Sequence, residues 1–413
     1  MAQKSDGAGH KSRRSFLIAS GAAGVAALAG CTGGQNNGSD GSSGGSSGGS
    51  SGGSSGGSSD GSSGGSSGGS PDGSSGGSPE VTKLSGAGSS FVNPLMQKWA
   101  SVYKDQNDLE VNYRSIGSGG GVSNLMDKTV VFAGSDAPLS KDQYNKVQKD
   151  GGCVHVPESL GAIAPVFNID GVSDLKLTGK ALADIFQGKI TEWNDSAITD
   201  LNPDANLPNA KITVAHRSDA SGTTYGFTGY LSQMSSSWKN QIGQTETPDC
   251  PVGVGGKGNE GVSAVMTKQS NAIGYVELTY AKQNDLGIFK LKNKAGNFVE
   301  ATPAGVSAAA EGAAQNLPKG TADWSDVSIS NAPGDKTWPI STFTYVIMYH
   351  DFGKAYKDKS EAEMKATLEF VNWAITSGQQ YAPDLHYPKL PSAAAKLDKQ
   401  TLKGMTYNGK SVL

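Results

Sequence analysis

The sequence predicts an α/β protein whose folded part is large enough for two domains. From Val81 onward, short apolar segments that fit strands alternate with amphipathic segments that fit helices, which is typical of α/β folds. The 333 residues after Glu80 exceed what one hydrophobic core usually supports, so two domains or lobes are expected. The residues before Val81 show neither pattern and form a separate region of the sequence.

The strands are predicted from short apolar runs and the helices from apolar residues three and four apart. The predicted strands are Glu110–Tyr113, Val130–Ala133, Ile163–Asn168, Ile212–Ala215, Ala272–Val276 and Phe343–Tyr349. The predicted helices contain Leu95, Trp99 and Val102; Val122, Leu125 and Met126; and Phe227, Tyr230, Leu231, Met234 and Trp238.

The composition of the first 80 residues differs from that of the rest. Thr32–Ser78 holds 39 Gly or Ser among 47 residues, so it cannot bury apolar surface and we expect a flexible linker. The 413-residue chain carries 35 Lys and Arg against 38 Asp and Glu, a formal net charge of −3. This near balance argues against nucleic acid or an anionic membrane surface as the partner.

The N-terminus has the pattern of an export signal. The basic cluster Lys11–Arg14 precedes 15 apolar or small residues, Phe16–Gly30. Fifteen residues are too few for a helix to cross a bilayer core of about 30 Å, which favours a cleaved signal over a membrane span. Ser12–Leu17 also resembles a twin-arginine export motif, so we expect residues 1–30 to be a signal peptide.

The end of this signal resembles a bacterial lipobox. Leu28-Ala29-Gly30-Cys31 has its pattern, in which the cysteine is lipid-modified and becomes the first mature residue. We therefore expect lipid on Cys31, followed by the linker over residues 31–80. A lipid there would hold the folded part near the outer face of the cytoplasmic membrane, in a periplasm or at the cell surface.

The two remaining cysteines leave two possibilities open. Export would place Cys153 and Cys250 in an oxidising compartment, where they could form a disulfide. The alternative is two unpaired thiols.

Three turns rich in Gly and Ser precede the three predicted helices: Ser85–Phe91, Gly117–Gly121 and Arg217–Thr224. Such turns offer unobstructed backbone N–H groups, hydroxyl donors and the positive end of a helix dipole. Together with Arg217 they would form a cradle for a tetrahedral oxyanion. Taken singly, each turn could instead be an ordinary helix cap.

Asp136 is an unexpected residue in an anion site. A carboxylate repels an anion unless the anion brings a proton to share. Inorganic phosphate carries a proton near neutral pH and sulfate does not, so a buried Asp136 would select phosphate over sulfate. The alternative for Asp136 alone is a turn or helix-capping aspartate.

At these residues the sequence resembles the substrate-binding proteins of phosphate ABC transporters, the PstS type. The resemblance covers nearly all of Val81–Leu413. It rests on seven blocks: Ser85–Gly88 with Ser90-Phe91; Asn112-Tyr113 with Ile116–Gly120; Gly134–Leu139; Arg217–Thr223; Gly255–Asn259; Ala272–Glu277; and Trp338–Ile340.

The resemblance implies a two-lobe periplasmic-binding-protein fold with hinge strands and a ligand cleft between the lobes. Lobe I would comprise residues 81–157 plus 338–413, and lobe II residues 158–337. The implied phosphate ligands are Ser90, Phe91 through its backbone N–H, Ser118, Asp136 as proton acceptor, Arg217, Ser221, Gly222 and Thr223. Asp219 would pair with Arg217 and orient it. Ser90 stands where Thr is more usual, but it retains the hydroxyl.

The resemblance also implies a function without chemistry on the ligand. Such a protein captures inorganic phosphate with high affinity outside the cytoplasmic membrane and delivers it to an ABC transporter permease. The resemblance implies no cofactor, and we expect a monomer tethered by lipid at Cys31.

The alternative functions are a phosphoester hydrolase or transferase and a binding protein for another tetrahedral oxyanion. A phosphoester hydrolase or transferase would need a base beside a nucleophilic serine, and none of the five histidines lies in a nucleophile motif. The same fold could also bind sulfate, molybdate or a phosphonate, and arsenate is protonated like phosphate. Gly253–Gly258 fits a dinucleotide-binding pattern, but Pro248–Pro251 replaces the strand that should precede it. The spacings typical of zinc ligands are absent from the sequence.

Overall fold

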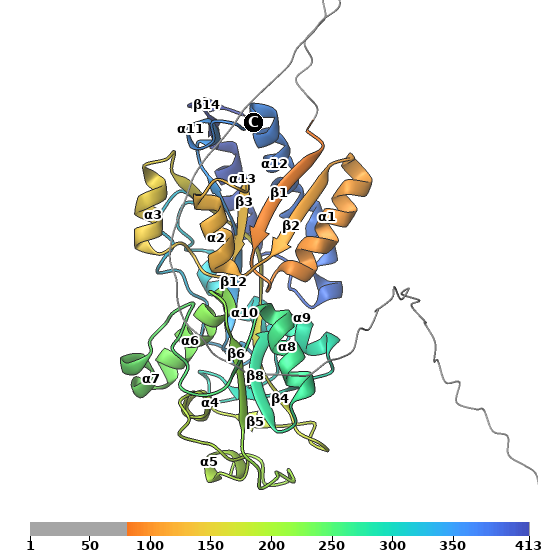
Figure 1. The fold of residues 1–413 in the computed structure, drawn as a ribbon, viewed down its shortest axis with the longest axis vertical. Coiled ribbons are helices and arrows are strands. Elements are labelled where there is room, and N and C mark those ends of the chain that lie inside the picture. The colour runs from red at the N-terminus through yellow and green to blue at the C-terminus, as the bar shows by residue number, and fades with distance from the viewer. Residues whose placement is uncertain (1–80, 413) are drawn as a thin grey trace, which may run out of the picture. The chain divides into compact units, whose positions relative to one another are not determined.

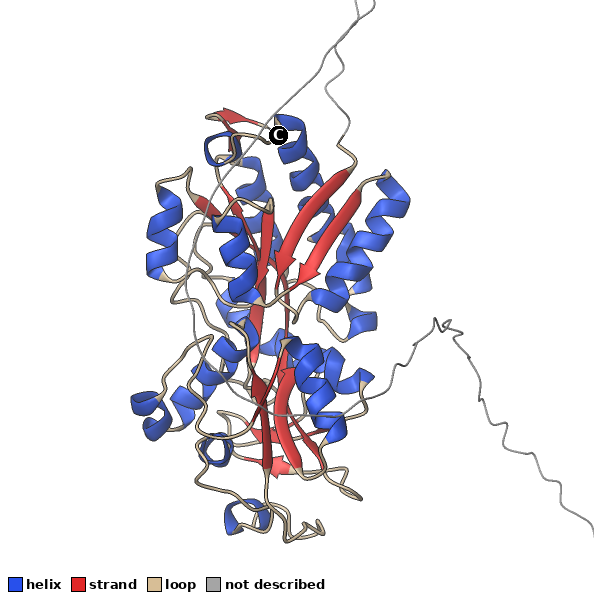
Figure 2. Ribbon diagram, viewed as in Figure 1, coloured by secondary structure: helices blue, strands red, loops and turns tan. Residues whose placement is uncertain are grey.

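The computed structural model describes residues 81–412. The expected signal peptide, the expected lipidation site Cys31 and the Gly/Ser linker lie outside the described residues. Within residues 81–412, helices lie on both sides of a large mixed sheet (Figures 1 and 2). The fold is therefore α/β, as the alternation of apolar segments predicts.

The large sheet contains nine strands. They are β1 (Lys83–Gly88), β2 (Glu110–Ser115), β3 (Phe132–Ser135), β4 (Cys153–Asn168), β6 (Thr213–Arg217), β7 (Val254–Gly256), β8 (Ala272–Glu277), β9 (Gly287–Ile288) and β12 (Ser341–Tyr349). Their order is β2-β1-β3-β12-β4-β8-β6-β7, and β9 pairs with β4. A three-stranded sheet holds β5 (Lys176–Leu177), β10 (Lys290–Lys292) and β11 (Phe298–Val299), and β13 (Thr406–Tyr407) pairs with β14 (Lys410–Ser411).

The long strand β4 joins two regions of this sheet. Its residues 153–162 pair with β12, while residues 163–168 pair with β8. We call β1, β2, β3, β12 and the first part of β4 the first sheet region. The second sheet region comprises β6, β7, β8, β9 and the rest of β4. Figure 1 shows the first region towards the top and the second towards the bottom.

The helices connect these strands and cover them. They are α1 (Asn93–Asn107), α2 (Ser118–Met126), α3 (Lys141–Gln148), α4 (Gly179–Phe186), α5 (Ser196–Thr199), α6 (Gly222–Met234), α7 (Ser236–Gln241), α8 (Gly258–Lys268), α9 (Leu278–Gln283), α10 (Pro303–Ala314), α11 (Phe352–Ala355), α12 (Glu361–Ala374) and α13 (Ser392–Lys403). Two 3₁₀ helices, η1 (Ser377–Tyr381) and η2 (Pro383–Leu385), follow α12.

Each of the six predicted strands overlaps a strand of the large sheet, but the prediction misses β1, β7, β9 and the first part of β4. Residues 85–88, expected to begin a Gly/Ser turn, are the end of β1. The apolar run at residues 163–168 is the second part of a strand that begins at Cys153. Pro157 interrupts the pattern, and in the structure it lies at the irregularity where the β4–β12 register shifts, a position that tolerates proline. The strand predicted at Val130–Ala133 corresponds to β3, which begins two residues later, at Phe132, and ends at Ser135.

The third predicted helix is in fact two helices. Apolar spacing continues from Phe227 to Trp238, but α6 ends at Met234 and α7 begins at Ser236. Ser235 between them has extended backbone angles, and its hydroxyl accepts a hydrogen bond from the Trp238 N–H, which caps α7. The hydroxyl side chain thus offers the backbone an alternative to a continuous helix.

Both remaining cysteines are free thiols in the structure. Cys153 is buried at the start of β4, and Cys250 is half-buried in the loop before β7. Of the two possibilities left open by the sequence, the structure has the unpaired thiols.

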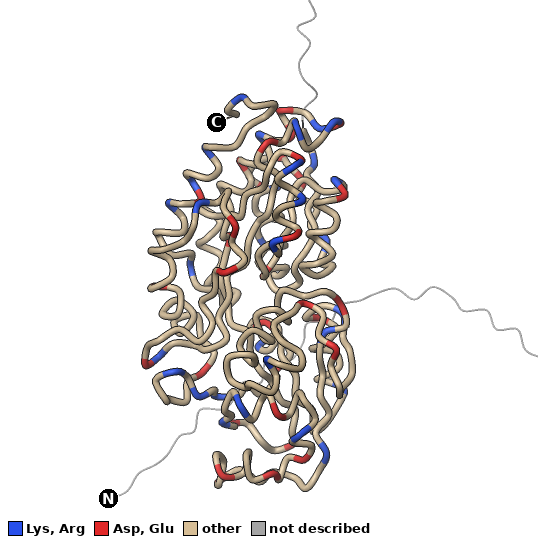
Figure 3. Tube along the Cα trace, turned by 90° about the vertical axis from the view of Figure 1, so that its left-hand side faces the viewer, with Lys and Arg blue, Asp and Glu red and all other residues tan. Residues whose placement is uncertain are grey.

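The surface of the described part carries both signs of charge. Basic and acidic positions are interspersed along the chain (Figure 3). No helix within residues 81–412 combines the length and the apolar character that a membrane crossing needs.

Aromatic side chains fill the core of the first sheet region. Phe132 is fully buried, with its ring 6.2 Å from that of Tyr113 and 5.9 Å from that of Phe370. The same ring leaves no room at Gly86, where an added Cβ would lie 2.2 Å from it. This packing fixes the end of β1 against β3.

We expect Phe132→Ala to lower the free energy of unfolding by about 3–5 kcal/mol, because it removes apolar contacts and leaves a cavity. Urea unfolding followed by tryptophan fluorescence measures this change. The control is Val254→Ala, since Val254 is 47% exposed and its truncation should change the same free energy by less than about 0.5 kcal/mol. Equal effects of the two substitutions would contradict the description of the core.

Candidate functional site

The Gly/Ser turns lead into the N-termini of α1, α2 and α6. Helix α2 begins at Ser118, directly after Gly117, whose φ of 85° lies in the region that glycine tolerates best. Helix α6 begins at Gly222, and the hydroxyl of Ser221 caps it by accepting from the Thr224 N–H at 3.1 Å. The first backbone N–H groups of each helix lack partners within the helix and lie at the positive end of its dipole.

Asp136 directly follows β3, and its side chain contacts residues from several elements. One carboxylate oxygen, Oδ1, accepts a hydrogen bond from the Ser89 hydroxyl, and the other, Oδ2, accepts one from Thr223 Oγ1 at 3.2 Å. The Asp136 N–H donates to Ser118 Oγ at 3.3 Å, and its carbonyl accepts from Thr342 Oγ1 at 3.2 Å. Asp136 is therefore the residue at which the turn after β1, helix α2, helix α6 and strand β12 meet.

The surroundings of Asp136 shift its pKa in two directions. The side chain is buried, and burial raises the pKa of this carboxyl to about 6. The hydrogen bond from Ser89, the positive charge of Arg217 and the hydrogen bonds involving Thr223 and Ser118 act in the opposite direction. A carboxyl with a pKa near 6 is mostly ionised at pH 7, so Asp136 can accept a proton from a ligand.

Arg217 lies at the end of β6 and supplies the positive charge of the site. Its guanidinium is buried and forms two hydrogen bonds with Asp219, from Nε to Oδ1 at 2.8 Å and from Nη2 to Oδ2 at 2.6 Å. Its Nη1 reaches Thr223 Oγ1 at 3.4 Å. Burial acts to raise the pKa of Asp219, but its bonds to Arg217 and the Gly258 N–H at 3.1 Å outweigh burial and lower that pKa. Asp219 therefore fixes the direction of the guanidinium.

Ser90 is held by a residue from the other side of the site. Its hydroxyl oxygen accepts hydrogen bonds from the N–H of Asn259 at 2.9 Å and from Asn259 Nδ2 at 3.0 Å. The same Nδ2 reaches Thr223 Oγ1 at 3.2 Å, and Asn259 Oδ1 accepts from the Glu277 N–H at 2.9 Å. The start of α8 thus joins the turn after β1 to the start of α6.

The two sheet regions approach closely at this point. A Cβ added at Gly222 would lie 2.6 Å from Ser118 Oγ and 2.8 Å from the backbone nitrogen of Asp136. Nearby, the Gly119 N–H donates to the carbonyl of Ala220 at 3.2 Å. Glycine at position 222 therefore allows the start of α6 to approach α2 and the end of β3.

The structure places the sequence-predicted residues in one cluster. Ser90, Ser118, Asp136, Arg217, Ser221 and Thr223 are all buried in it, together with Gly222. The Phe91 N–H, expected to face the ligand, donates to Ser89 Oγ at 2.9 Å, and the Phe91 ring packs edge-on against Tyr387. The roles of these residues towards a ligand stay predictions.

Two residues of the cluster were not singled out from the sequence. Ser89 contacts Asp136, and Asn259 contacts Ser90 and Thr223. Asn259 lies in one of the blocks of resemblance, Gly255–Asn259, and that block was the available signal. The same segment forms β7 and the start of α8, and the Gly258 N–H binds Asp219, so it contributes to this cluster.

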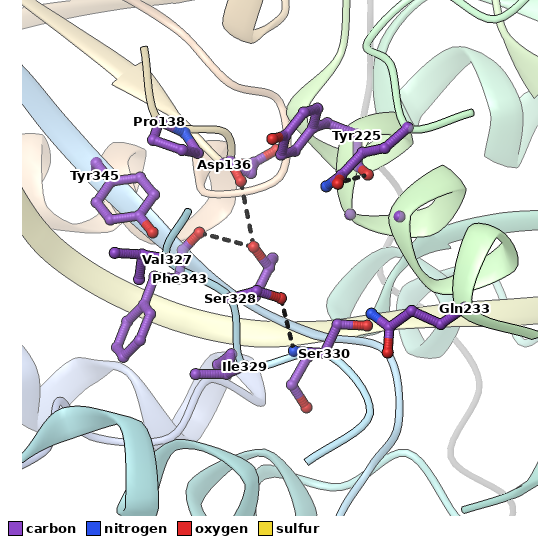
Figure 4. A pocket seen from close by; sticks show the side chains of 15 residues that line it. Asp136, Pro138, Tyr225, Gln233, Val327, Ser328, Ile329, Ser330, Phe343 and Tyr345 are labelled. Atoms are coloured by element: carbon purple, nitrogen blue, oxygen red, sulfur yellow. Dashed lines mark hydrogen bonds between the residues drawn. The ribbon is translucent and has the colours of Figure 1, made fainter. Parts of the chain in front are cut away.

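A cavity of about 130 Å³ lies beside Asp136 (Figure 4). Thr342, which binds the Asp136 carbonyl, lines it together with Tyr225, Ser328 and Tyr345. Its volume and polar lining suit ordered water. The backbone of Asp136 thus borders a polar space, while its carboxylate oxygens contact Ser89 and Thr223.

The described histidines are not placed to activate the serines of the three turns. Within residues 81–412, no histidine forms a hydrogen bond with Ser90, Ser118 or Ser221. His216 lies in β6, the same strand as Arg217, and its Nδ1 is 2.9 Å from the Arg217 carbonyl oxygen. His155 is buried, and burial lowers its pKa to about 3.

Comparison with known proteins shows the family. The family model described as the PBP superfamily domain matches residues 73–377. The chain is 41% identical over 321 residues to the phosphate-binding protein PstS of Xylella fastidiosa, covering 76% of this chain and 83% of that protein. It is also 41% identical over 326 residues to the protein of the same name from Haemophilus influenzae, covering 78% and 93%. The chain therefore belongs to the PBP superfamily and, within it, to the PstS family.

A solved structure supports the fold. The crystal structure of a phosphate-binding protein from Stenotrophomonas maltophilia matches with a TM-score of 0.58, covering 79% of this chain and 99% of that one. At 18% sequence identity this match concerns the fold alone.

We expect Gly222→Ala to prevent the close approach of the two sheet regions, because its Cβ would overlap Ser118 and the Asp136 backbone. Small-angle X-ray scattering should show a larger radius of gyration than for the unsubstituted protein. The matched control is Gly312→Ala, since a Cβ at Gly312 in α10 would meet nothing within 4 Å. Identical scattering from all three proteins would contradict this reading of the contact.

The buried carboxyl of Glu158 should make the free energy of unfolding depend on pH. It is fully buried in β4, where Oε1 accepts from Thr344 Oγ1 at 2.8 Å and Oε2 has no partner. Burial, assisted by the charge of Asp136, raises the pKa of Glu158 to about 8. The folded state therefore binds a proton more tightly than the unfolded state, so the free energy of unfolding should fall as pH rises from about 4.5 to about 8.

Glu158→Gln should lose this part of the pH dependence, because the amide cannot ionise. In urea unfolding we expect the variant to resemble the unsubstituted protein at pH 5 and to be the more stable of the two at pH 8.5. Glu369→Gln, at an exposed position of α12, serves as the control and should follow the unsubstituted protein throughout. A Glu158→Gln curve parallel to the unsubstituted one would refute the prediction.

Proposed function

We propose that this chain captures inorganic phosphate in the described cluster and delivers it to an ABC transporter permease. The observation that carries the proposal is the environment of Asp136. A buried carboxylate lies among hydroxyl groups, helix N-termini and one guanidinium, all of which suit an anion. The 41% sequence identity with two phosphate-binding PstS proteins, over 76% and 78% of this chain, supports phosphate as the ligand.

Asp136 gives the site its selectivity. An oxyanion that carries a proton can donate it to Asp136, whereas a fully ionised oxyanion would face the carboxylate without a hydrogen bond. Phosphate near neutral pH meets this condition, and sulfate does not. Arsenate is protonated like phosphate, so the same geometry would accept it.

The ligand contacts come from both sheet regions. Ser90, Ser118 and Asp136 would bind from the first region, and Arg217, Ser221, Gly222 and Thr223 from the second. The Phe91 N–H is left out of this set, because it donates to Ser89 Oγ. Asp219 would hold Arg217 in position through its two hydrogen bonds. Phosphate would then favour the closed arrangement, because only that arrangement brings both sets of groups to one ligand. We propose residues 81–157 plus 338–413 as lobe I and 158–337 as lobe II.

Delivery requires the protein to stay near a membrane. The twin-arginine signal over residues 1–30, lipid on Cys31 and the linker over residues 31–80 would anchor a monomer to the outer face of the cytoplasmic membrane. We propose a binding protein without catalytic activity and without a cofactor.

The direct test is a titration of the purified protein with phosphate and with sulfate by isothermal calorimetry. At pH 7 we expect saturable binding of phosphate and a Kd for sulfate about 10-fold higher, because a carboxyl with a pKa near 6 is protonated in only about a tenth of the molecules at that pH. Asp136→Asn should lower the ratio of phosphate affinity to sulfate affinity by about 10-fold, because an amide can donate a hydrogen bond to a fully ionised oxyanion without first being protonated. The control Asp200→Asn changes an exposed carboxylate after α5 and should leave both affinities unchanged. An unchanged ratio in Asp136→Asn would sink the proposed role of Asp136.

A further inference from the structure

The hydroxyl of Ser89 has a fixed position and a fixed direction. Ser89 follows the last residue of β1 and is buried. Its N–H donates to the Gly134 carbonyl at 2.8 Å, and its own carbonyl accepts from the Tyr113 hydroxyl at 3.0 Å. Ser89 Oγ accepts from the Phe91 N–H at 2.9 Å and donates its proton to Asp136 Oδ1. The hydroxyl therefore connects a backbone donor to the carboxylate.

Ser89 and Asp136 belong to the same sheet region. They lie just beyond the paired residues Gly88 and Gly134 of the adjacent parallel strands β1 and β3. The second hydrogen bond of the carboxylate, from Thr223, comes from α6 and joins the two sheet regions. The Ser89 bond would therefore survive a separation of the two sheet regions, and the Thr223 bond would not.

We propose that Ser89 is a specificity-determining residue, which keeps Asp136 ionised and turned so that Oδ2 is the oxygen that accepts the ligand's proton. This inference rests on the proposed function. Oδ1 is already engaged by Ser89, so the carboxylate presents one acceptor towards Thr223 and Arg217.

Removal of the hydrogen bond from Ser89 would change the pKa of Asp136. Burial raises the pKa of Asp136, and the Ser89 bond is the largest of the influences that lower it. Without that bond the pKa of Asp136 would rise towards neutrality. A protonated Asp136 donates a hydrogen bond, so it would accept sulfate and lose its preference for a protonated ligand.

Other ionisable groups also face Asp136, and they stay in place when Ser89 is changed. Arg217, paired with Asp219, favours the ionised form of Asp136. The remaining groups that interact electrostatically with Asp136 are Glu158 in β4, Glu246 in the loop after α7, Tyr113 in β2 and Tyr345 in β12. Because these groups are common to all the variants compared, a difference between variants reports the Ser89 bond.

The test compares the unsubstituted protein with Ser89→Ala, Ser89→Thr and the control Ser85→Ala. Ser85 is a half-buried serine of β1 that forms no hydrogen bond with Asp136. The Kd values for phosphate and for sulfate are measured by calorimetry from pH 5.5 to pH 8.5. The ligand's own ionisation is identical for every variant at each pH, so it cancels from the comparison.

We expect the ratio of phosphate affinity to sulfate affinity to fall at low pH in every protein. In Ser89→Ala the midpoint of this fall should move upward by about one pH unit, the effect of one lost hydrogen bond to a charged group. The ratio at pH 7 should then drop about 10-fold. Ser89→Thr retains a hydroxyl and should have the pH profile of the unsubstituted protein. The control Ser85→Ala should have the same profile.

A second measurement needs no ligand. Carbon NMR of the aspartate carboxyl groups gives the pKa of Asp136, which should lie near 6 in the unsubstituted protein and higher in Ser89→Ala. If the unsubstituted protein prefers phosphate but Ser89→Ala has the same pH profile and the same Asp136 pKa, the inference about Ser89 is wrong while the proposed function stands. If the unsubstituted protein binds neither anion, the proposed function fails, and an unmoved Asp136 pKa would separately overturn the role of Ser89.

Discussion

The burial of one carboxylate among hydrogen-bond donors is the constraint on which the rest of the site depends. Asp136 is removed from water, which is costly for a charged group unless hydrogen bonds and an opposite charge compensate. Ser89, Ser118 and Thr223 supply hydroxyl contacts, and Arg217 supplies the charge. These four partners come from the turn after β1, from α2, from α6 and from β6, so Asp136 joins distant parts of the chain.

The charge balance of the cluster suits a ligand that is neutralised by dipoles. The single guanidinium is already paired with Asp219, and Asp136 adds a negative charge. Attraction for an anion must therefore come largely from backbone N–H groups, hydroxyls and the N-termini of α2 and α6. Such groups hold an anion without a large net charge, which agrees with the interspersed basic and acidic positions along the chain in Figure 3.

The sequence predicts the local features of this arrangement well. The turns before α1, α2 and α6 could be recognised because Gly and Ser have specific roles at helix starts. The sequence predicts the register between strands that are distant along the chain poorly. Adjacent serines 89 and 90 look alike in the sequence, yet the pairing of β1 with β3 directs one towards Asp136 and the other towards Asn259. The first part of β4 was missed because Pro157 and Glu158 interrupt its apolar pattern. The break between α6 and α7 depends on the hydrogen bond that the Ser235 hydroxyl accepts from the Trp238 N–H.

In the proposed function, the bound ligand shares a proton with Asp136. Neutron diffraction from crystals of the phosphate complex, grown in deuterated solvent near pH 7, observes that proton directly. We predict a deuterium on the line between a phosphate oxygen and Asp136 Oδ2, with the two oxygens about 2.5–2.7 Å apart. Phosphate bound with only bare oxygens near Asp136, or bound away from this carboxylate, would contradict the claim.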